Sequence, residues 1–334
     1  MTAPAAGRSP AGRQVVVLGG SGFLGRHLSA AFRQAGADVL AVSRTAPAQR
    51  HLAPGVRALA MDLTSAGPDR LAGLLAEAGA DLVVNAAGAV WGVTQGEMRR
   101  ANAELVGDLV EAMAGLPDQP RLIQLGSVHE YGPGAVGGGT AESHTPAPIT
   151  PYGQVKLLAS DRVLAAARSG ALDGVVLRIA NITGPGTPPG SLLGGLAERL
   201  ARLREAADPD PVLELAPLRA SRDFVDVRDV VDAVLATAAA AADLVRGQVI
   251  NIGSGRATPV RHAVERLIAH SKVAARLVER ESGTARSDTE WQQLDIAKAG
   301  RLLGWQPHHD LDGSLGALAD GTRAPIREGR NGHE

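Results

Sequence analysis

The stretch VVVLGGSGFLGRHL, residues 15–28, decides the fold class of this 334-residue chain. A run of valines is followed by closely spaced glycines and then by an apolar–polar pattern of helical period. The stretch therefore predicts a buried strand, a tight turn and a helix. Similar apolar runs and helical patterns alternate through the first half of the chain. Continuous Val/Leu/Ile strands separated by helices imply an α/β fold, a doubly wound parallel sheet with helices on both faces.

The expected strands are short apolar runs, and they lie at 14–19, 38–43, 56–62, 81–88, 121–127, 174–181, 211–216 and 248–255. The expected helices have an apolar period near 3.6, and they lie at about 23–35, 95–114, 191–206 and 221–242, with one more that begins at 151. After Asn181 the regular alternation loosens, which predicts a smaller C-terminal region. The expected organisation is a disordered lead-in (1–12), a nucleotide-binding domain (13–182 and about 225–256), a substrate-binding region (183–224 and 257–325) and a tail (326–334).

Composition and charge exclude several classes of protein. The net charge of −1 gives no electrostatic footprint for nucleic acid. Because the sequence has no cysteine, disulfides, thiolate zinc sites and cysteine nucleophiles are excluded. There is no run of 18 apolar residues, and the N-terminal stretch lacks the apolar core of a signal peptide. We expect no membrane partner and a cytoplasmic location.

The glycine turn predicts a site for a dinucleotide. Gly20, Gly22 and Gly25 match the spacing G-x-G-x-x-G, and Gly19 extends the set. Glycines in this strand–turn–helix context permit the tight turn and the close approach of a diphosphate, while the helix start supplies free N–H groups.

The end of the second strand indicates which dinucleotide is bound. NAD sites usually have an acidic residue there, which binds the adenosine ribose. This chain has Ser43 and Arg44 instead, and an arginine suits a 2′-phosphate. Arg26 is a possible second contact. We therefore expect NADP(H) rather than NAD(H), although both arginines are also interpretable as ordinary surface residues. Asp62, after the third strand, is a candidate for the adenine amino group or for a simple loop cap.

A rare tyrosine and a rare lysine lie four residues apart in PYGQVKLLAS, residues 151–160. The chain has two tyrosines and three lysines. Thr150 and Pro151 predict the start of a helix, so Tyr152 and Lys156 are expected on one helical face. A phenol ionises near about pH 10, and a neighbouring ammonium favours its ionised form. The pair therefore predicts a proton donor and acceptor.

These features, taken with others, resemble the short-chain dehydrogenase/reductase superfamily. The resemblance is to its extended branch, the NAD(P)-dependent sugar epimerase/dehydratase family, and it covers about residues 14–315. It rests on the glycine loop and on the segments NAAG (85–88), LGSVHEYG (125–132), YGQVK (152–156), LRIANITGPG (177–186), SRDFVDVRDVVDAV (221–234), NIGSG (251–255) and LLGWQP (302–307).

The resemblance implies roles for individual residues. Ser127 matches the catalytic serine, Tyr152 the catalytic acid/base, and Lys156 the residue that holds the nicotinamide ribose and lowers the pKa of the tyrosine. Asn102 matches an asparagine that supports this site. The implied substrate contacts are Ser127, Val128, His129, Asn181 and Arg222. The implied cofactor contacts are Gly19, Gly22, Phe23, Leu24, Gly25, Ser43, Arg44, Asp62, Leu63, Ala86, Tyr152 and Lys156.

Asn181 and Arg222 match residues that hold the phosphates of a nucleotide-sugar in this family. Guanidinium groups bind phosphate bidentately, which suits Arg222 to this role. An ion pair of Arg222 with Asp223 or Asp226 is the alternative interpretation.

The reaction predicted by the resemblance is a ketone reduction. The 4,6-dehydratases of this family have Asp-Glu after the catalytic hydroxyl residue, where this chain has Val128 and His129. Epimerases acting through C3 or C5 often need a cysteine with a histidine, so only His129 remains for that role. The nearest resemblance is to 4-ketoreductases of nucleotide-linked, dTDP-type deoxysugars. An NAD-dependent 4-epimerase and a non-catalytic NADP-binding sensor are the alternatives. Family members pair through the helices at about 98–114 and 151–168, which predicts a homodimer.

Overall fold

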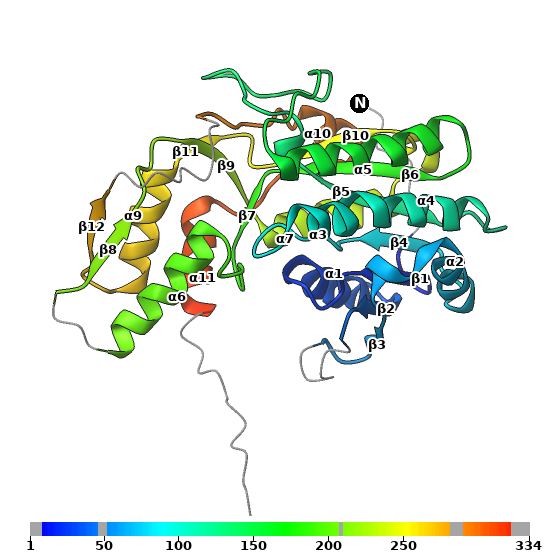
Figure 1. Cartoon of the computed structure of the whole chain (residues 1–334), viewed down its shortest axis with the longest axis horizontal. Helices are drawn as coiled ribbons and strands as arrows, with labels where there is room; N and C mark the ends of the chain where they lie inside the picture. The colour runs from blue at the N-terminus through cyan, green and yellow to red at the C-terminus, as the bar shows by residue number, and fades with distance from the viewer. Residues whose placement is uncertain (1–8, 46–51, 207–209, 281–289, 322–334) are drawn as a thin grey trace, which may run out of the picture.

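A seven-stranded parallel sheet forms the centre of the protein, as the computed structural model in Figure 1 shows. The structure describes residues 9–45, 52–206, 210–280 and 290–321. In spatial order the strands are β10 (Val249–Ile252), β6 (Gly174–Ile179), β5 (Arg121–Ser127), β4 (Leu82–Asn85), β1 (Gln14–Leu18), β2 (Asp38–Ser43) and β3 (Arg57–Ala60). All neighbouring pairs are parallel. This arrangement confirms the predicted doubly wound sheet.

The strands are buried because helices cover both faces of the sheet. Every residue of β4, β5 and β6 is buried, as the continuous apolar runs predict. One face packs against α1 (Phe23–Gln34), α7 (Val227–Ala239) and α10 (Ala297–Leu303). The other face packs against α2 (Gly67–Glu77), α4 (Leu105–Ala114) and α5 (Pro151–Arg168). Short helical segments complete this half: η2 (Leu63–Ser65), α3 (Gln95–Arg99), a π-helical turn η3 (Arg100–Glu104), η4 (Val128–Glu130) and α8 (Ala242–Val245).

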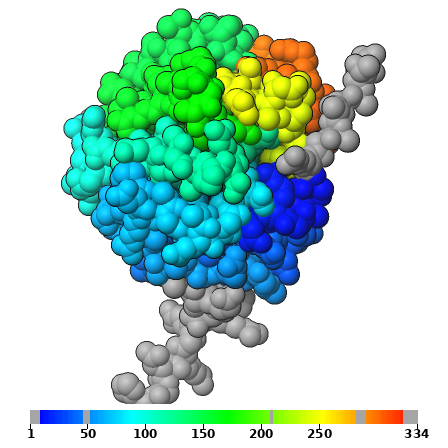
Figure 2. Space-filling model, turned by 90° about the vertical axis from the view of Figure 1, so that its right-hand side faces the viewer, coloured from blue at the N-terminus to red at the C-terminus, as the bar shows by residue number. Residues whose placement is uncertain are grey.

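The C-terminal half contributes to both parts of the molecule. In Figure 2 the yellow and orange segments, near residues 250 and 300, lie against the green and blue N-terminal half. The smaller region lies to one side of the sheet in Figure 1 and has its own apolar core. It contains α6 (Leu192–Glu205), α9 (Val260–Ser271) and α11 (Leu311–Gly321), with β8 (Val212–Leu215) parallel to β12 (Arg276–Glu279).

A three-stranded sheet connects the two parts, and here the structure differs from the predicted elements. It consists of β11 (Ala257–Pro259), β9 (Ser221–Asp226) and β7 (Asn181–Thr183). The predicted helix at 221–242 is therefore wrong for its first six residues. They pair with β7 and β11, and the Asp226 side chain caps α7 by accepting the Arg228 N–H at 2.8 Å.

The predicted strand at 174–181 is divided in the same way. Its last residue belongs to β7, so Asn181 leaves the main sheet and lies beside Phe224 of β9. The predicted lead-in falls largely on residues 1–8 and the tail on residues 326–334, which lie outside the described residues. Among the residues that are described, no helix is long and apolar enough to cross a membrane.

Candidate active site

The glycine loop is packed so closely that a side chain is excluded at Gly19, Gly20 and Gly25. Gly19 has φ +77°, and its N–H and that of Gly20 donate to the Val42 carbonyl at 2.9 and 3.0 Å. A Cβ on Gly20 would lie 2.6 Å from the Ala41 Cβ, and one on Gly25 would collide with the Gly19 carbonyl oxygen. Helix α1 then begins with no side-chain cap at Gly22. Its first N–H groups are therefore available to an anion, so this loop fits a dinucleotide diphosphate.

The ends of β2 and β3 form the adenosine side of this site. Ser43 is buried and its hydroxyl donates to the Thr45 carbonyl at 3.0 Å, while Arg44 is exposed. Hydrogen bonds from the Thr64 hydroxyl and N–H lower the pKa of Asp62, and nearby Arg44 lowers it further. Asp62 therefore caps η2, which is the loop-capping role that the sequence offered as the alternative to adenine binding.

Three other predicted cofactor contacts have hydrophobic side chains that lie in an apolar core or pack against one. Leu63 is 5% exposed within one apolar core, and Leu24 packs on the other. Ala86 also packs on a core, and its N–H donates to the Leu18 carbonyl at 3.0 Å. Phe23 opens α1, where the His27 ring meets it edge-on at 5.7 Å. The arginine considered as a second phosphate contact, Arg26, donates to the Gly186 carbonyl at 3.0 Å, in the loop that leads to α6.

Asn102 supports the loop that follows β4. It lies in the π-helical turn between α3 and α4, and its Nδ2 donates to the Ala89 carbonyl at 2.7 Å and the Met98 carbonyl at 2.9 Å. A Cβ on Gly88 would lie 2.7 Å from the Asn102 Oδ1, so the loop and the asparagine fit each other closely. π-Helical turns within α-helices are frequently found at functional sites.

Ser127, Tyr152 and Lys156 come together where β5 ends and α5 begins. Thr150 caps α5 by accepting the Gly153 N–H at 3.1 Å, with Pro151 at the first helical position, as predicted. The Ser127 hydroxyl is hydrogen-bonded to the Tyr152 side chain. The Lys156 Nζ donates to the Leu125 carbonyl, two residues before the serine. The three side chains predicted to carry the chemistry therefore form one cluster.

The ionisation of Tyr152 differs from the expectation that Lys156 lowers its pKa. Burial raises the pKa of Tyr152 to about 12, and the Glu130 carboxylate raises it further, against the hydrogen bond with Ser127. Burial also lowers the pKa of Lys156, and Glu130 opposes this effect. Tyr152 as a whole residue is half-buried, and the carboxylate of Glu130 is the charge that acts on its phenol. Tyr152 therefore holds its proton at neutral pH.

His129 lies beside the same cluster, and the charge of Arg222 acts on His129. The His129 and Tyr152 rings meet edge-on with centroids 5.9 Å apart. Burial, with a further effect of the Arg222 charge, lowers the pKa of His129 to about 4, so the imidazole is neutral at pH 7. Burial lowers the pKa of Arg222 to about 10, which leaves its guanidinium charged at neutral pH.

The carboxylates proposed as alternative partners of Arg222 bind other groups. Asp223 accepts the N–H groups of Ser254, Gly255 and Leu294, and Asp226 pairs with Arg228 at 2.8 Å. The Asn181 Nδ2 donates to the Asp223 carbonyl at 3.0 Å, which keeps it beside β9.

The sequence matches a described family over most of its length. Residues 15–253 match the "NAD dependent epimerase/dehydratase family". The chain is 45% identical over 313 residues to the dTDP-6-deoxy-L-talose 4-dehydrogenase (NAD(P)(+)) of Kitasatospora kifunensis, which spans 93% of this chain and 95% of that protein. This chain belongs to the NAD-dependent epimerase/dehydratase family. It is therefore an NAD(P)-dependent enzyme of the extended short-chain dehydrogenase/reductase type, as the motifs predict.

Solved structures of similar proteins agree with this family assignment. MoeE5 in complex with UDP-glucuronic acid and NAD is 28% identical with a TM-score of 0.75, covering 93% of this chain and 99% of that one. RMD from Pseudomonas aeruginosa, complexed with NADPH, is 24% identical with a TM-score of 0.78, covering 93% and 99%. At 24% identity, the similarity to RMD shows a shared fold and nothing further.

Two residues next to Ser127 are buried. Val128, expected as a substrate contact, is 3% exposed and its side chain belongs to the apolar core. Glu130 was not singled out, yet it is fully buried beside Ser127. Its position within the VHEYG segment was the only available signal.

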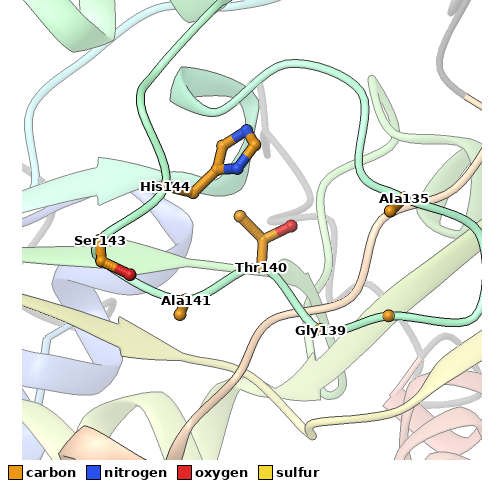
Figure 3. Close-up of a pocket in the computed structure, with 7 residues that line it drawn as sticks. Ala135, Gly139, Thr140, Ala141, Ser143 and His144 are labelled. Atoms are coloured by element: carbon orange, nitrogen blue, oxygen red, sulfur yellow. The ribbon is translucent and has the colours of Figure 1, made fainter.

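A cavity of about 300 Å³ lies in the loop between β5 and α5 (Figure 3). Its lining residues are Ala135, Gly138, Gly139, Thr140, Ala141, Ser143 and His144. Ser127, Tyr152 and Lys156 are not among them, so this cavity is separate from the catalytic cluster.

The close packing of the glycine loop predicts the effect of one added methyl group. Gly25→Ala forces the loop away from the Gly19 carbonyl, so we expect NADPH affinity to fall at least tenfold by titration calorimetry. Gly73→Ala is the matched control, because a Cβ at this helical glycine meets nothing within 4 Å. Unchanged affinity in folded Gly25→Ala would contradict the assignment of this loop to the cofactor.

Proposed function

We propose that this enzyme reduces a keto group, at C4, of a nucleotide-linked deoxysugar with NADPH. The observation that carries the proposal is the cluster of Ser127, Tyr152 and Lys156 where β5 ends and α5 begins, in a chain that is 45% identical to a dTDP-6-deoxy-L-talose 4-dehydrogenase. Carbonyl reduction needs a proton donor at the carbonyl oxygen. A phenol, which ionises only near about pH 10 in water, is such a donor at neutral pH.

In this proposal the hydroxyls of Ser127 and Tyr152 converge on the carbonyl oxygen of the substrate. The nicotinamide supplies the hydride that reduces the carbonyl carbon. The Tyr152 phenol gives its proton to the oxygen, so that the C=O group becomes CH–OH. Lys156, held against the Leu125 carbonyl, is one turn along α5 from Tyr152 and is the residue placed to hold the nicotinamide ribose. General acid catalysis of this kind contributes about 10²–10⁴-fold to the rate.

The substrate class follows from the similar Kitasatospora enzyme and from the charge in the site. That enzyme is named for oxidation–reduction at C4 of a dTDP-linked 6-deoxyhexose. The same reaction in reverse is the reduction of a 4-keto-6-deoxysugar. The buried, charged guanidinium of Arg222 is of the kind that binds a nucleotide diphosphate, whereas the Asn181 Nδ2 already donates to the Asp223 carbonyl and the Gln292 Oε1.

The other activities of the family fit this site less well. A dehydratase needs a carboxylate after the serine, and Val128 is an aliphatic residue within the core. An epimerase acting through C3 or C5 needs an extra base, and the imidazole of His129, with a pKa of about 4, is a weak one. An NAD-dependent 4-epimerase is the remaining alternative. A non-catalytic sensor is disfavoured, because Tyr152 and Lys156 are both present and adjacent.

The tyrosine pair of this chain gives a direct test of the proton donor. Tyr152→Phe keeps the ring but removes the proton, so we expect turnover of a dTDP-4-keto-6-deoxysugar with NADPH to fall by about 10²–10⁴-fold. NADPH binding should persist. Tyr131→Phe is the matched control, because the Tyr131 hydroxyl donates to the Asn251 side chain and not to the substrate site. Near-normal turnover in Tyr152→Phe would show that another group supplies the proton.

The preference for NADPH rests on the residues after β2. Arg44 is an exposed guanidinium at the position that suits a 2′-phosphate, and an acid is missing there. We expect Arg44→Ala to weaken NADPH relative to NADH by on the order of 1.5–3 kcal/mol, the size of a lost charged hydrogen bond. The measurement is kcat/KM for both cofactors, with exposed Arg70→Ala on α2 as the control. Equal or better use of NADH by the unaltered enzyme would overturn the preference.

We also propose a homodimer that pairs α4 and α5 with their copies. Along the outer face of α5, Leu158 is partly exposed between the exposed side chains of Gln154, Asp161 and Ala165. An apolar residue in such a stripe is suited to burial against a partner helix.

Leu158→Glu introduces a charge into the proposed interface, so we expect the mass in solution to change from dimer to monomer in light scattering at micromolar concentration. Val136→Glu replaces an apolar residue that is 75% exposed in the loop before α5, and it should leave the mass unchanged. A monomeric unaltered protein would contradict the proposal.

A further inference from the structure

A buried carboxylate lies directly behind the catalytic serine and has no part in the mechanism above. Glu130 ends η4 and is 0% exposed. Its Oε1 accepts the Ser127 N–H at 2.8 Å, and its Oε2 lies 2.7 Å from the Arg178 Nε. Arg178 is on β6 and is 3% exposed. Charged residues are almost never fully buried unless they are paired, so this ion pair is a specific feature of the site.

The surrounding structure is shaped to hold this pair. A Cβ on Gly126 would lie 2.6 Å from the Glu130 Oε1, so only glycine leaves room for the carboxylate. The Arg178 guanidinium lies over the Tyr131 ring at 4.3 Å, and the Tyr131 hydroxyl donates to the Asn251 Oδ1 at 2.8 Å. Residues from β5, η4, β6 and β10 therefore fix the position of Glu130.

The charge of Glu130 reaches the two groups that handle the proton. Burial raises the pKa of Glu130, but the guanidinium of Arg178 opposes this effect, and an arginine does not lose its proton in a protein. The 2.7 Å separation of the Glu130 Oε2 and the Arg178 Nε is that of an ion pair. The negative charge acts on the Tyr152 phenol and on the Lys156 ammonium.

The other charged and titratable groups near Tyr152 come from several elements. They are Lys156 on the same helix, Arg178 on β6 behind Glu130, neutral His129 on η4, and Arg222 on β9 beyond that histidine. Among these described groups, Glu130 is the one that carries a negative charge.

We propose that Glu130 is a positioning residue for this active site: it fixes the backbone of Ser127 and supplies the buried negative charge that Tyr152 and Lys156 face. The consequence is that the phenol keeps its proton until a carbonyl oxygen takes it. The roles of Ser127 and Tyr152 rest on the proposed function. A purely structural ion pair would join β5 to β6 without affecting the ionisation of Tyr152, and this difference is measurable.

The chain has only two tyrosines, so each can be titrated separately. Protein labelled with ¹³C at the tyrosine Cζ gives two NMR signals, and Tyr131→Phe identifies the one from Tyr152. In the unaltered protein this signal should remain that of a phenol across the alkaline range in which the protein is folded. In Glu130→Gln we expect the Tyr152 midpoint to move down by about 1–3 pH units, the range produced by one nearby charge. An unmoved Tyr152 midpoint in the folded variant would overturn the proposal.

Glu142→Gln is the matched control. Burial raises the pKa of Tyr131, and the Glu142 carboxylate raises it too. The Glu142 Oε1 accepts the Asn251 N–H at 2.9 Å, at the far end of the same network. This variant should move the Tyr131 signal and leave the Tyr152 signal in place. If it moves Tyr152 as much as Glu130→Gln does, the effect is not specific to Glu130 and the proposal fails.

A second variant keeps the test decisive if Glu130→Gln does not fold. The double variant Glu130→Gln/Arg178→Gln removes both charges and leaves no unpaired guanidinium in the core. It should also lower the Tyr152 midpoint, and an unmoved midpoint would reject the role of Glu130. These titrations need no substrate. If the enzyme fails to reduce any 4-ketosugar, the proposed function fails while the titration still decides the role of Glu130.

Discussion

The carboxylate of Glu130 lies between β5 and β6, where it binds the Ser127 N–H and the Arg178 guanidinium. A buried charge is tolerated only when its partners are held in place, so this pair constrains the chain around it. It fixes where β5 ends, how η4 turns and how Ser127 faces α5. The same charge acts on Tyr152 and Lys156, which links the packing of the core to the protonation of the site.

The parallel sheet explains why residues distant in sequence meet at one edge. The carboxyl ends of β1, β2, β4 and β5 lead into the glycine loop, Ser43, the loop supported by Asn102, and Ser127. Ligands of open α/β sheets bind outside this edge. The three-stranded sheet holds Asn181 and Arg222 from later segments; the charge of Arg222 acts on His129, whose ring meets that of Tyr152. In the proposed reaction these segments form the substrate side and the glycine loop forms the cofactor side.

Much of this arrangement was predictable from the sequence, because the signals are local. Strands β2 and β5 have the predicted bounds, since an apolar run between a turn and a polar residue marks a buried strand. Thr150 and Pro151 likewise predict the start of α5. The helix predicted at 221–242 fails over β9, because that strand depends on pairing with β7 and β11, which lie about 40 residues away on either side.

The ionisation of the site was not predictable either, because it too depends on contacts between residues that are distant in the sequence. Glu130 and Arg178 are 48 residues apart, and nothing local indicates that they form an ion pair. The sequence alone therefore suggests that the ammonium of Lys156 lowers the pKa of Tyr152. In the structure, burial and the Glu130 carboxylate raise the pKa of Tyr152.

The central claim is that this enzyme transfers hydride to C4 of a nucleotide-linked ketosugar, with Tyr152 as the acid. The most direct measurement uses NADPH that carries deuterium in the transferred position, together with a dTDP-4-keto-6-deoxysugar. The account predicts stoichiometric oxidation of NADPH and one deuterium at C4 of the product, seen by NMR and mass spectrometry. Conversion of the sugar without net oxidation of NADPH, or deuterium at another carbon, would contradict it.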